Sequence, residues 1–174
     1  MPVFFWNDDN DKKYRKAYFD KFPGVWAHGD FIEINDHGGI KIFGRSDSTL
    51  NPGGVRIGTA EIYRVVEAFD EIADSLVIGQ ECKGDQRMIL FLKLAESYSL
   101  NNILTKKLKQ SIKSNCSPRH VPEIVLPIDD IPYTLSGKKI EIAVKKIIDG
   151  EGVVNRDALA NPDSLDLYSS ISEL

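Results

Sequence analysis

Apolar residues recur at helical spacing in three separate stretches of the chain. In each stretch they follow the i, i+3, i+4 pattern that places them on one face of a helix. The three sets are Ile62, Val65, Val66 and Phe69; Leu104, Leu108 and Ile112; and Ile140, Ala143, Val144, Ile147 and Ile148. Gly150 follows the last set, as is typical of helix ends. The pattern therefore predicts three amphipathic helices, each with one face toward a core.

Short apolar runs lie between and beside these helical stretches. They cover residues 75–78, 88–94 and 123–126, and Lys83-Gly84-Asp85 supplies turn residues between the first two. The resulting order is helix, strand, strand, helix, strand, helix. We therefore expect an α+β fold, a small three-stranded sheet with packed helices.

The first part of the chain, up to about residue 43, has a different pattern. Tyr14, Tyr18 and Phe22 fall four apart, which predicts that they share one face of a helix. Residues 31–34 and 40–43 then resemble two strands around a turn at residues 35–39, which predicts a β-hairpin. Aromatic and basic residues are interleaved here, but four aspartates interrupt the positive field, which argues against nucleic-acid binding.

Composition indicates a globular protein without choosing a function. The 174 residues, 42% hydrophobic and 28% charged, allow one domain with a core, or one domain and part of another. The formal net charge of -4 gives no general attraction to nucleic acid or to an anionic membrane, so any anion site must be local. No apolar run approaches the roughly 20 residues that span a bilayer. The N-terminus does not resemble a signal peptide, and we expect a cytoplasmic location.

The remaining composition offers no metal site. Cys82 and Cys116 are the only cysteines, and neither belongs to a cluster with zinc-ligand spacing. The three histidines are scattered, so we assign no metal ligand. Beyond Gly150 the chain becomes polar, and we expect an extension that lies on the surface.

Two glycine-containing segments carry the candidate chemistry. They are GRSDSTLNPGGVRIGTAEI at residues 44–62 and PYTLSGK at residues 132–138. The second is not a Walker phosphate loop, because Pro132 stands in place of its first glycine and Lys139 in place of its Ser or Thr. Lys138 is then a compact ammonium on a loop, suited to neutralising charge at a phosphorus centre. The alternative is a solvated lysine before a helix.

In this order, the two segments resemble the hinge and catalytic-lysine motifs of the adenylate-forming synthetases, the superfamily of acyl-CoA synthetases, luciferases and peptide-synthetase adenylation domains. The resemblance implies that Lys138 orients the substrate carboxylate and stabilises the adenylation transition state. It implies that Arg45 contacts the nucleotide ribose and that a small domain rotates about Asp47. It also implies that Arg56 lies near the ATP phosphates and that Asp30, in a Gly-Asp motif, binds the ribose hydroxyls.

The resemblance further implies a binding site for CoA. Gly53 and Gly54 would admit the pantetheine chain after the small domain has rotated, since glycine has no Cβ in the way. Lys113 stands where related acyl-CoA synthetases carry an arginine near the CoA phosphates, and it keeps the charge without the planar fork. Single cations and Gly-Asp pairs are otherwise common as surface charge and turn residues, so these roles depend on the resemblance.

Sequence segments more specific than the superfamily motifs resemble the acetoacetyl-CoA synthetase family along essentially the whole chain. Acetyl-CoA and propionyl-CoA synthetases are close relatives, and Tyr63 and the tail after Gly150 favour the acetoacetyl family over them. The segments that carry this resemblance are MPV with FWND at 1–8, YFDKFPGVW at 18–26, LNPGGVRIGTAEIY at 50–63 and NRDALANP at 155–162.

The resemblance implies three parts. Residues 1–46 would be the C-terminal remnant of the large AMP-binding domain, residues 47–150 the small mobile domain, and residues 151–174 a C-terminal extension. The loop that grips the ATP phosphates, the protein ligands of Mg²⁺ and the acyl pocket would then lie in a missing large adenylation domain, the expected partner.

The expected reaction is that of a ligase: acetoacetate, ATP and CoA give acetoacetyl-CoA, AMP and pyrophosphate. We expect the chain alone to be inactive. Its small-molecule ligands would be ATP or AMP, CoA and a short-chain carboxylate, with Mg²⁺ carried by ATP. The alternatives are a fragment of an acetyl- or propionyl-CoA synthetase, or a non-catalytic module that binds a partner. The oligomeric state is left open.

Overall fold

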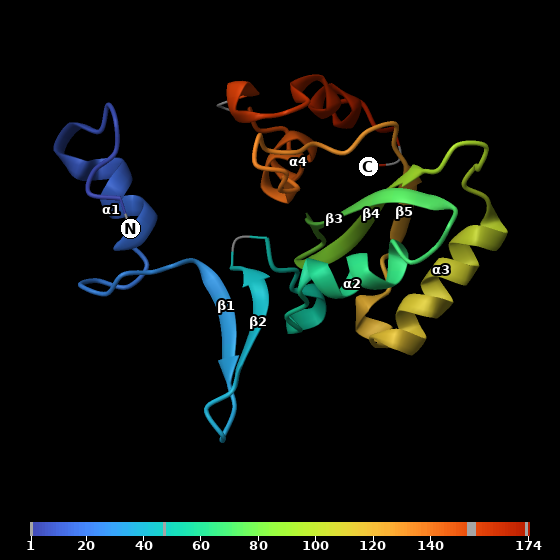
Figure 1. Cartoon of the computed structure of the whole chain (residues 1–174), viewed down its shortest axis with the longest axis horizontal. Helices are drawn as coiled ribbons and strands as arrows, with labels where there is room; N and C mark the ends of the chain where they lie inside the picture. The colour runs from blue at the N-terminus through green and yellow to red at the C-terminus, as the bar shows by residue number, and fades with distance from the viewer. Residues whose placement is uncertain (1, 47, 153–155, 173) are drawn as a thin grey trace. The chain divides into compact units, whose positions relative to one another are not determined.

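A computed structural model describes residues 2–46, 48–152, 156–172 and 174 of the chain. The chain divides into two compact units, residues 1–47 and residues 48–174, both shown in Figure 1. Asp47, the predicted hinge, lies outside the described residues, so its role stays a prediction.

The first unit contains one short helix and a β-hairpin. Helix α1 spans Lys12–Tyr18 and follows a 3-10 turn at Asp9–Asp11. Strands β1 (Asp30–Ile34) and β2 (Ile40–Arg45) pair antiparallel. The turn between them is closed by the N–H of Asn35, which donates to the carbonyl of Gly39 at 3.0 Å. The hairpin predicted from the sequence is confirmed.

The predicted alignment of three aromatic residues on one helix face is only partly correct. Tyr14 and Tyr18 do lie together, with ring centroids 5.3 Å apart, and both contact the ring of Phe5. Helix α1 ends at Tyr18, however, and Phe22 is 52% exposed beyond it. The chain cannot continue as a helix there because Pro23 follows and Gly24 has a positive φ of 75°.

The second unit is built on a three-stranded sheet in the order β3-β4-β5. Strands β3 (Ile72–Cys82) and β4 (Asp85–Leu94) are antiparallel, and β5 (Ile124–Pro127) runs parallel to β4. Lys83 and Gly84 both have positive φ, as a two-residue hairpin turn requires. Because this turn is so tight, pairing continues to its edge and the strands are longer than the apolar runs that predicted them.

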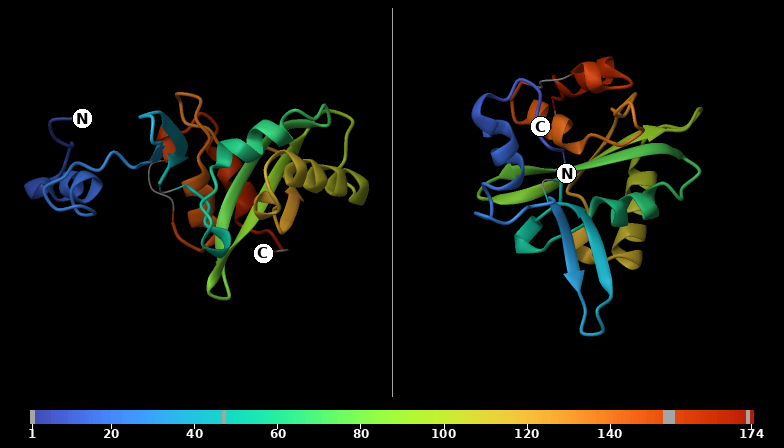
Figure 2. Two further views of the ribbon diagram at one scale, coloured as in Figure 1. Left: turned by 90° about the horizontal axis from the view of Figure 1, so that it is seen from below. Right: turned by 60° about the vertical axis from the view of Figure 1, so that its left-hand side comes forward.

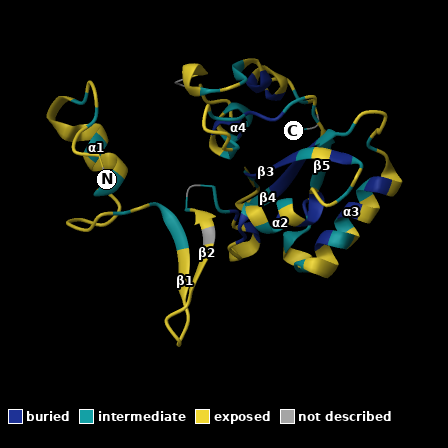
Figure 3. Cartoon of the chain, in the orientation of Figure 1, coloured by how far each residue is buried: buried dark blue, intermediate teal, exposed yellow. Residues whose placement is uncertain are grey.

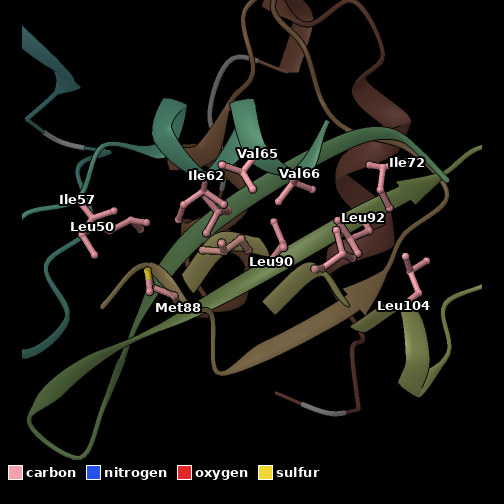
Figure 4. Close-up of a cluster of buried hydrophobic side chains, with 13 residues drawn as sticks. Leu50, Ile57, Ile62, Val65, Val66, Ile72, Met88, Leu90, Leu92 and Leu104 are labelled. Atoms are coloured by element: carbon pink, nitrogen blue, oxygen red, sulfur yellow. The ribbon is translucent and has the colours of Figure 1, made fainter. Parts of the chain in front are cut away.

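Helices cover both faces of this sheet (Figure 2). Along β4, alternate side chains point to opposite faces, so Met88, Leu90 and Leu92 belong to one core cluster and Ile89 and Phe91 to the other. The first cluster, shown in Figure 4, contains the buried residues of α2 (Thr59–Val66) and α3 (Asn102–Asn115). The second contains those of α4 (Glu141–Ile148). The predicted α+β class is confirmed.

Short 3-10 segments connect these elements at Pro52–Gly54, Pro118–His120 and Arg156–Ala158. The start of α3 is defined by Asn101, whose side-chain oxygen accepts from the backbone N–H groups of Ile103 and Leu104 at 3.0 and 2.9 Å. Such a cap satisfies donors that have no partner inside the helix.

Part of the tail after Gly150 packs into the core, so the expectation that the tail lies on the surface is only partly correct. A 3-10 helix, η5 (Pro162–Tyr168), buries Leu165 and Tyr168 against the second cluster. Dark blue, the colour of buried residues, marks part of this segment in Figure 3. The ring of Tyr168 meets that of Phe91 edge to face at 5.0 Å, and its hydroxyl donates to the carbonyl of Asp130 at 3.1 Å.

The carboxylate of Asp130 also joins the tail to the sheet. It accepts from Lys93 Nζ at 2.7 Å and from Asn161 Nδ2 at 2.6 Å. Burial alone would raise the pKa of Asp130, but these two donors outweigh it and hold the pKa below its ordinary value.

Asp130→Asn is expected to destabilise the protein in a pH-dependent way. A carboxyl whose pKa is lowered by folding stabilises the fold above its unfolded pKa, about 3.9, and this contribution is lost as the pH falls through the folded pKa. The difference in unfolding free energy between wild type and variant should be largest near neutral pH and should shrink below about pH 4. Urea denaturation at several pH values measures it, and a difference that stayed constant down to pH 3 would argue against this role.

Candidate functional site

Lys138 lies at the end of a tight turn that closes on itself. Tyr133 and Lys139 form an antiparallel bridge at its base. Within the turn, the N–H of Thr134 donates to the carbonyl of Lys138 at 2.8 Å, and the N–H of Lys138 donates to Thr134 Oγ1 at 3.0 Å. Gly137 has a φ of 76°, a conformation that glycine adopts without strain. The loop therefore has a defined backbone.

The amine of Lys138 is available for a ligand. Its residue is exposed, and its side chain makes no hydrogen bond or ion pair with any other part of the chain that the structure describes. The neighbouring Lys139 is instead only 16% exposed and forms ion pairs with Glu67 and Asp74. An internal ion pair of Lys138 would have excluded the predicted role, and it is Lys139 that forms such pairs.

The tail lies against the same loop. The N–H of Ala160 donates to the carbonyl of Tyr133 at 2.9 Å, the N–H of Leu135 donates to the carbonyl of Ala158 at 3.2 Å, and Thr134 forms a bridge with Leu159. These contacts join segments more than twenty residues apart, and the sequence did not predict them.

In the first unit, the structure brings Asp30 and Arg45 together as partners in the hairpin register. Arg45 Nη1 lies 3.6 Å from Asp30 Oδ1 and donates to the carbonyl of His28 at 3.0 Å. Gly29 permits this approach, because a Cβ on it would lie 2.8 Å from Arg45 Nη2 and its φ is +85°. The two predicted ribose contacts thus occupy one site.

Sequence reasoning missed His28 as a member of this site. Its Nδ1 hydrogen-bonds Asp30 Oδ2, and its ring meets that of Trp26 edge to face at 5.1 Å. An open pocket of about 570 Å³ adjoins these residues, within the size range of ligand pockets. Its lining includes cationic and aromatic side chains, among them Lys16, Lys21, Trp26, His28 and Arg45.

In the second unit, Gly53 and Gly54 form an exposed turn with φ values of 56° and 76°. The N–H of Gly53 donates to Asp85 Oδ1 at 2.9 Å, and this bond holds the pKa of Asp85 below its ordinary value. A Cβ at Gly53 would lie 2.7 Å from Arg119 Nη1, whereas nothing lies within 4 Å of one at Gly54. Arg119 is therefore a neighbour of this turn, which the sequence had not indicated.

The other two predicted cations are both exposed. Arg56 precedes Ile57, whose backbone pairs with that of Leu50 through hydrogen bonds of 3.0 and 2.9 Å. Lys113 lies in the last turn of α3, and no hydrogen bond or ion pair joins its side chain to another described residue. Their roles, like those of Asp30, Arg45 and Lys138, remain predictions.

Across the described ranges, no group of three or more His, Cys, Asp or Glu residues is placed to hold a metal ion. The same part of the chain contains no helix long and apolar enough to cross a membrane.

The chain is similar in sequence to known synthetases along its whole length. It is 55% identical over 174 residues to the acetoacetyl-coenzyme A synthetase of Rhizobium meliloti (strain 1021), covering 27% of that protein. It is 57% identical over 176 residues to the acetoacetyl-CoA synthetase of Xenopus tropicalis, covering 26% of it. The chain thus spans about a quarter of the length of these relatives. No protein-family model matches the chain.

A solved structure agrees with this similarity. The acetoacetyl-CoA synthetase from Streptomyces lividans superposes with a TM-score of 0.87 at 45% sequence identity, over 97% of this chain and 26% of the other.

Proposed function

Because the chain belongs to the acetoacetyl-CoA synthetase family, in which it matches the C-terminal quarter, we propose that it supplies the lysine-bearing small domain of an AMP-forming ligase. The proposed reaction converts acetoacetate, ATP and CoA into acetoacetyl-CoA, AMP and pyrophosphate. The observation that carries this proposal is the contrast between two adjacent lysines. Lys138 is exposed and its amine has no partner among the residues that the structure describes, whereas Lys139 is largely buried and paired with carboxylates.

The first half-reaction needs a cation at the phosphorus. A carboxylate oxygen of acetoacetate attacks the α-phosphorus of ATP, the bond to the bridging oxygen breaks, and pyrophosphate leaves. The ammonium of Lys138 would neutralise charge on the carboxylate and on the phosphoryl oxygens as they approach, and a preorganised charge of this kind lowers the barrier. Magnesium would enter with ATP, and we expect its protein ligands outside this chain.

The second half-reaction does not need this lysine. The thiol sulfur of CoA attacks the acyl carbon, gives up its proton, and AMP leaves. Gly53 and Gly54 would lie along the pantetheine chain, where the open space beside Gly54 suits close approach. Arg56 would contact the ATP phosphates, and Lys113 those of CoA.

Asp30 and Arg45 would hold the ribose. The carboxylate can accept hydrogen bonds from both vicinal hydroxyls, and Arg45 can only donate. Their side chains are 29% and 53% exposed, so the pair is open to a ligand. His28 would orient the Asp30 carboxylate through its own hydrogen bond.

The chain alone should not activate acetoacetate, because the acyl pocket and most phosphate contacts are proposed to lie in the large domain. We expect no acetoacetate-dependent exchange of pyrophosphate into ATP by the isolated chain. Exchange should appear when the chain replaces the corresponding quarter of the Rhizobium meliloti enzyme. This chimera is called the host enzyme below.

The control is the large domain of the Rhizobium meliloti enzyme alone, without the C-terminal quarter that this chain supplies. Exchange by the isolated chain would contradict its dependence on a large domain. A folded host enzyme that showed no exchange would contradict the proposed ligase function.

A second candidate function is a non-catalytic module that binds a partner through the hairpin. Ile32 pairs with Ile42 and Ile34 with Ile40, so four isoleucines share one face, and they are 48% to 69% exposed. An apolar face of this kind is typical of an interaction surface. This candidate predicts that the chain binds the separate large domain without restoring exchange.

A further alternative is that the chain belongs to an acetyl- or propionyl-CoA synthetase. This alternative predicts pyrophosphate exchange in a chimera built on the large domain of that enzyme, and no exchange in the host enzyme defined above.

A further inference from the structure

We propose that Lys139 is a positioning residue, which locks the register of the loop so that Lys138 faces solvent. The proposal concerns a network of polar side chains at the base of the loop, between the start of β3 and the end of α2. It rests on the proposed function only where catalysis is concerned. The structural part can be tested on this chain by itself.

The amine of Lys139 is surrounded by acceptors. It forms ion pairs with Glu67 and, at 2.6 Å, with Asp74 Oδ1, and it donates to the carbonyl of Ser75 at 2.6 Å. It also lies 4.3 Å from the centre of the Tyr63 ring, a cation–π contact. The side chain of Lys139 is only 16% exposed. Moving its ammonium out of this network would cost free energy, because the two carboxylates would lose their counter-charge.

The other strand of the loop is tied to the same carboxylate. Tyr133 pairs with Lys139 across the bridge, and its hydroxyl donates to Asp74 Oδ2 at 2.5 Å. Asp74 therefore receives both residues at the base of the turn, one on each of its oxygens. Burial and this carboxylate raise the pKa of Tyr133 well above its ordinary value, so the hydroxyl remains a donor even at alkaline pH.

Because Lys138 and Lys139 are adjacent and identical, the pairing register of the loop would be ambiguous without the contacts of Lys139 and Tyr133 to Asp74. In extended backbone, neighbouring side chains point to opposite faces, so a shift of one residue would place Lys138 among the carboxylates and Lys139 in solvent. Both side chains are chemically identical, so their own preferences cannot decide between the two registers. The bridge at Tyr133, together with the fixed turn at Gly137, selects the one in which Lys138 is outside.

Amide hydrogen exchange on this chain tests the lock. In Lys139→Met, the N–H of Thr134, which bonds the carbonyl of Lys138, should exchange roughly 10-fold faster or more relative to amides of β4. Lys139→Arg, which keeps the charge, should restore most of the protection. Lys146→Met, at an exposed lysine of α4, is the matched control, and it should change neither the exchange of the Thr134 amide nor that of the β4 amides.

If Lys139 only stabilised the unit as a whole, the hydrogen-exchange result would differ. Lys139→Met would then speed exchange in the loop and in β4 by the same factor, and this outcome would overturn the proposal. If Lys139→Met does not fold, the triple variant Lys139→Met, Glu67→Gln, Asp74→Asn removes the buried charges together, and the same loop-specific acceleration is expected. Unchanged or uniform exchange in that variant would also overturn it.

The host enzyme then tests the link to catalysis. Lys139→Met should lower kcat for adenylate formation by roughly 10- to 100-fold, the scale expected when a catalytic group is misplaced, with little change in KM for ATP. Lys139→Arg should recover most of this loss. If Lys139→Met speeds exchange only in the loop but does not lower kcat, the role of Lys139 in fixing the register is supported and the catalytic role of Lys138 is contradicted. A loss of kcat without loop-specific exchange would count against the lock.

Discussion

Lys138→Ala should lower the rate of acetoacetyl-adenylate formation in the host enzyme by about 10²- to 10³-fold, the range found when one charge-stabilising donor is removed from a transition state. The amine is exposed and has no partner among the described side chains, so its loss breaks no contact within the fold. The effect should therefore fall on kcat, with the melting temperature unchanged. Acetoacetate-dependent pyrophosphate exchange measures it.

The control for this prediction is Lys146→Ala, which removes another exposed lysine from α4. It should leave exchange unchanged. Equal losses in the two variants would indicate a general effect of surface charge, and full activity of Lys138→Ala would remove the basis for the assigned role.

Tyr168→Ala should destabilise the second unit by about 3–5 kcal/mol, the usual cost of deleting a large buried aromatic side chain. Tyr168 is 2% exposed, packs edge to face on Phe91, and donates to the carbonyl of Asp130. The variant leaves a cavity beneath the sheet and also removes the donor to the carbonyl of Asp130. Denaturant titration followed by circular dichroism gives the free energy of unfolding.

Two variants separate the contributions. Tyr168→Phe keeps the ring and should lose only about 1 kcal/mol for the hydrogen bond. Tyr98→Ala removes a tyrosine that is 52% exposed and should change stability by less than about 0.5 kcal/mol. If Tyr168→Ala were no more harmful than Tyr98→Ala, the tail would not be part of the core in solution.

The periodicity of apolar residues was enough to predict the order of helices and strands in the second unit up to Gly150, although α2 ends at Val66, before the predicted Phe69. Helices α2, α3 and α4 each bury one apolar face, and strands β3 and β4 bury continuous apolar runs; both patterns are visible in one sequence. The tail was not predictable in this way. Leu165 and Tyr168 are buried from a 3-10 helix in a largely polar segment, and their burial depends on space beside Phe91 that only the folded sheet creates.

The candidate site was predictable in part for a similar reason. The Ser-Gly-Lys turn could be identified from local residue types, but the choice of which lysine faces outward depends on Glu67 and Asp74, more than sixty residues away along the chain. His28 was missed because only the Gly-Asp pair that follows it was given a role, and Arg119 because it lies outside the two glycine-containing segments. His28 contacts Asp30 from only two residues away along the chain, and the segment after α3 brings Arg119 to Gly53.

The most direct test of the central claim separates the two half-reactions in Lys138→Ala. Single-turnover rates would be measured in the host enzyme for adenylate formation from acetoacetate and ATP, and for thioester formation from preformed acetoacetyl-adenylate and CoA. The account predicts a fall of about 10²-fold or more in the first rate and a change of less than about 3-fold in the second. Equal losses in both rates would contradict it.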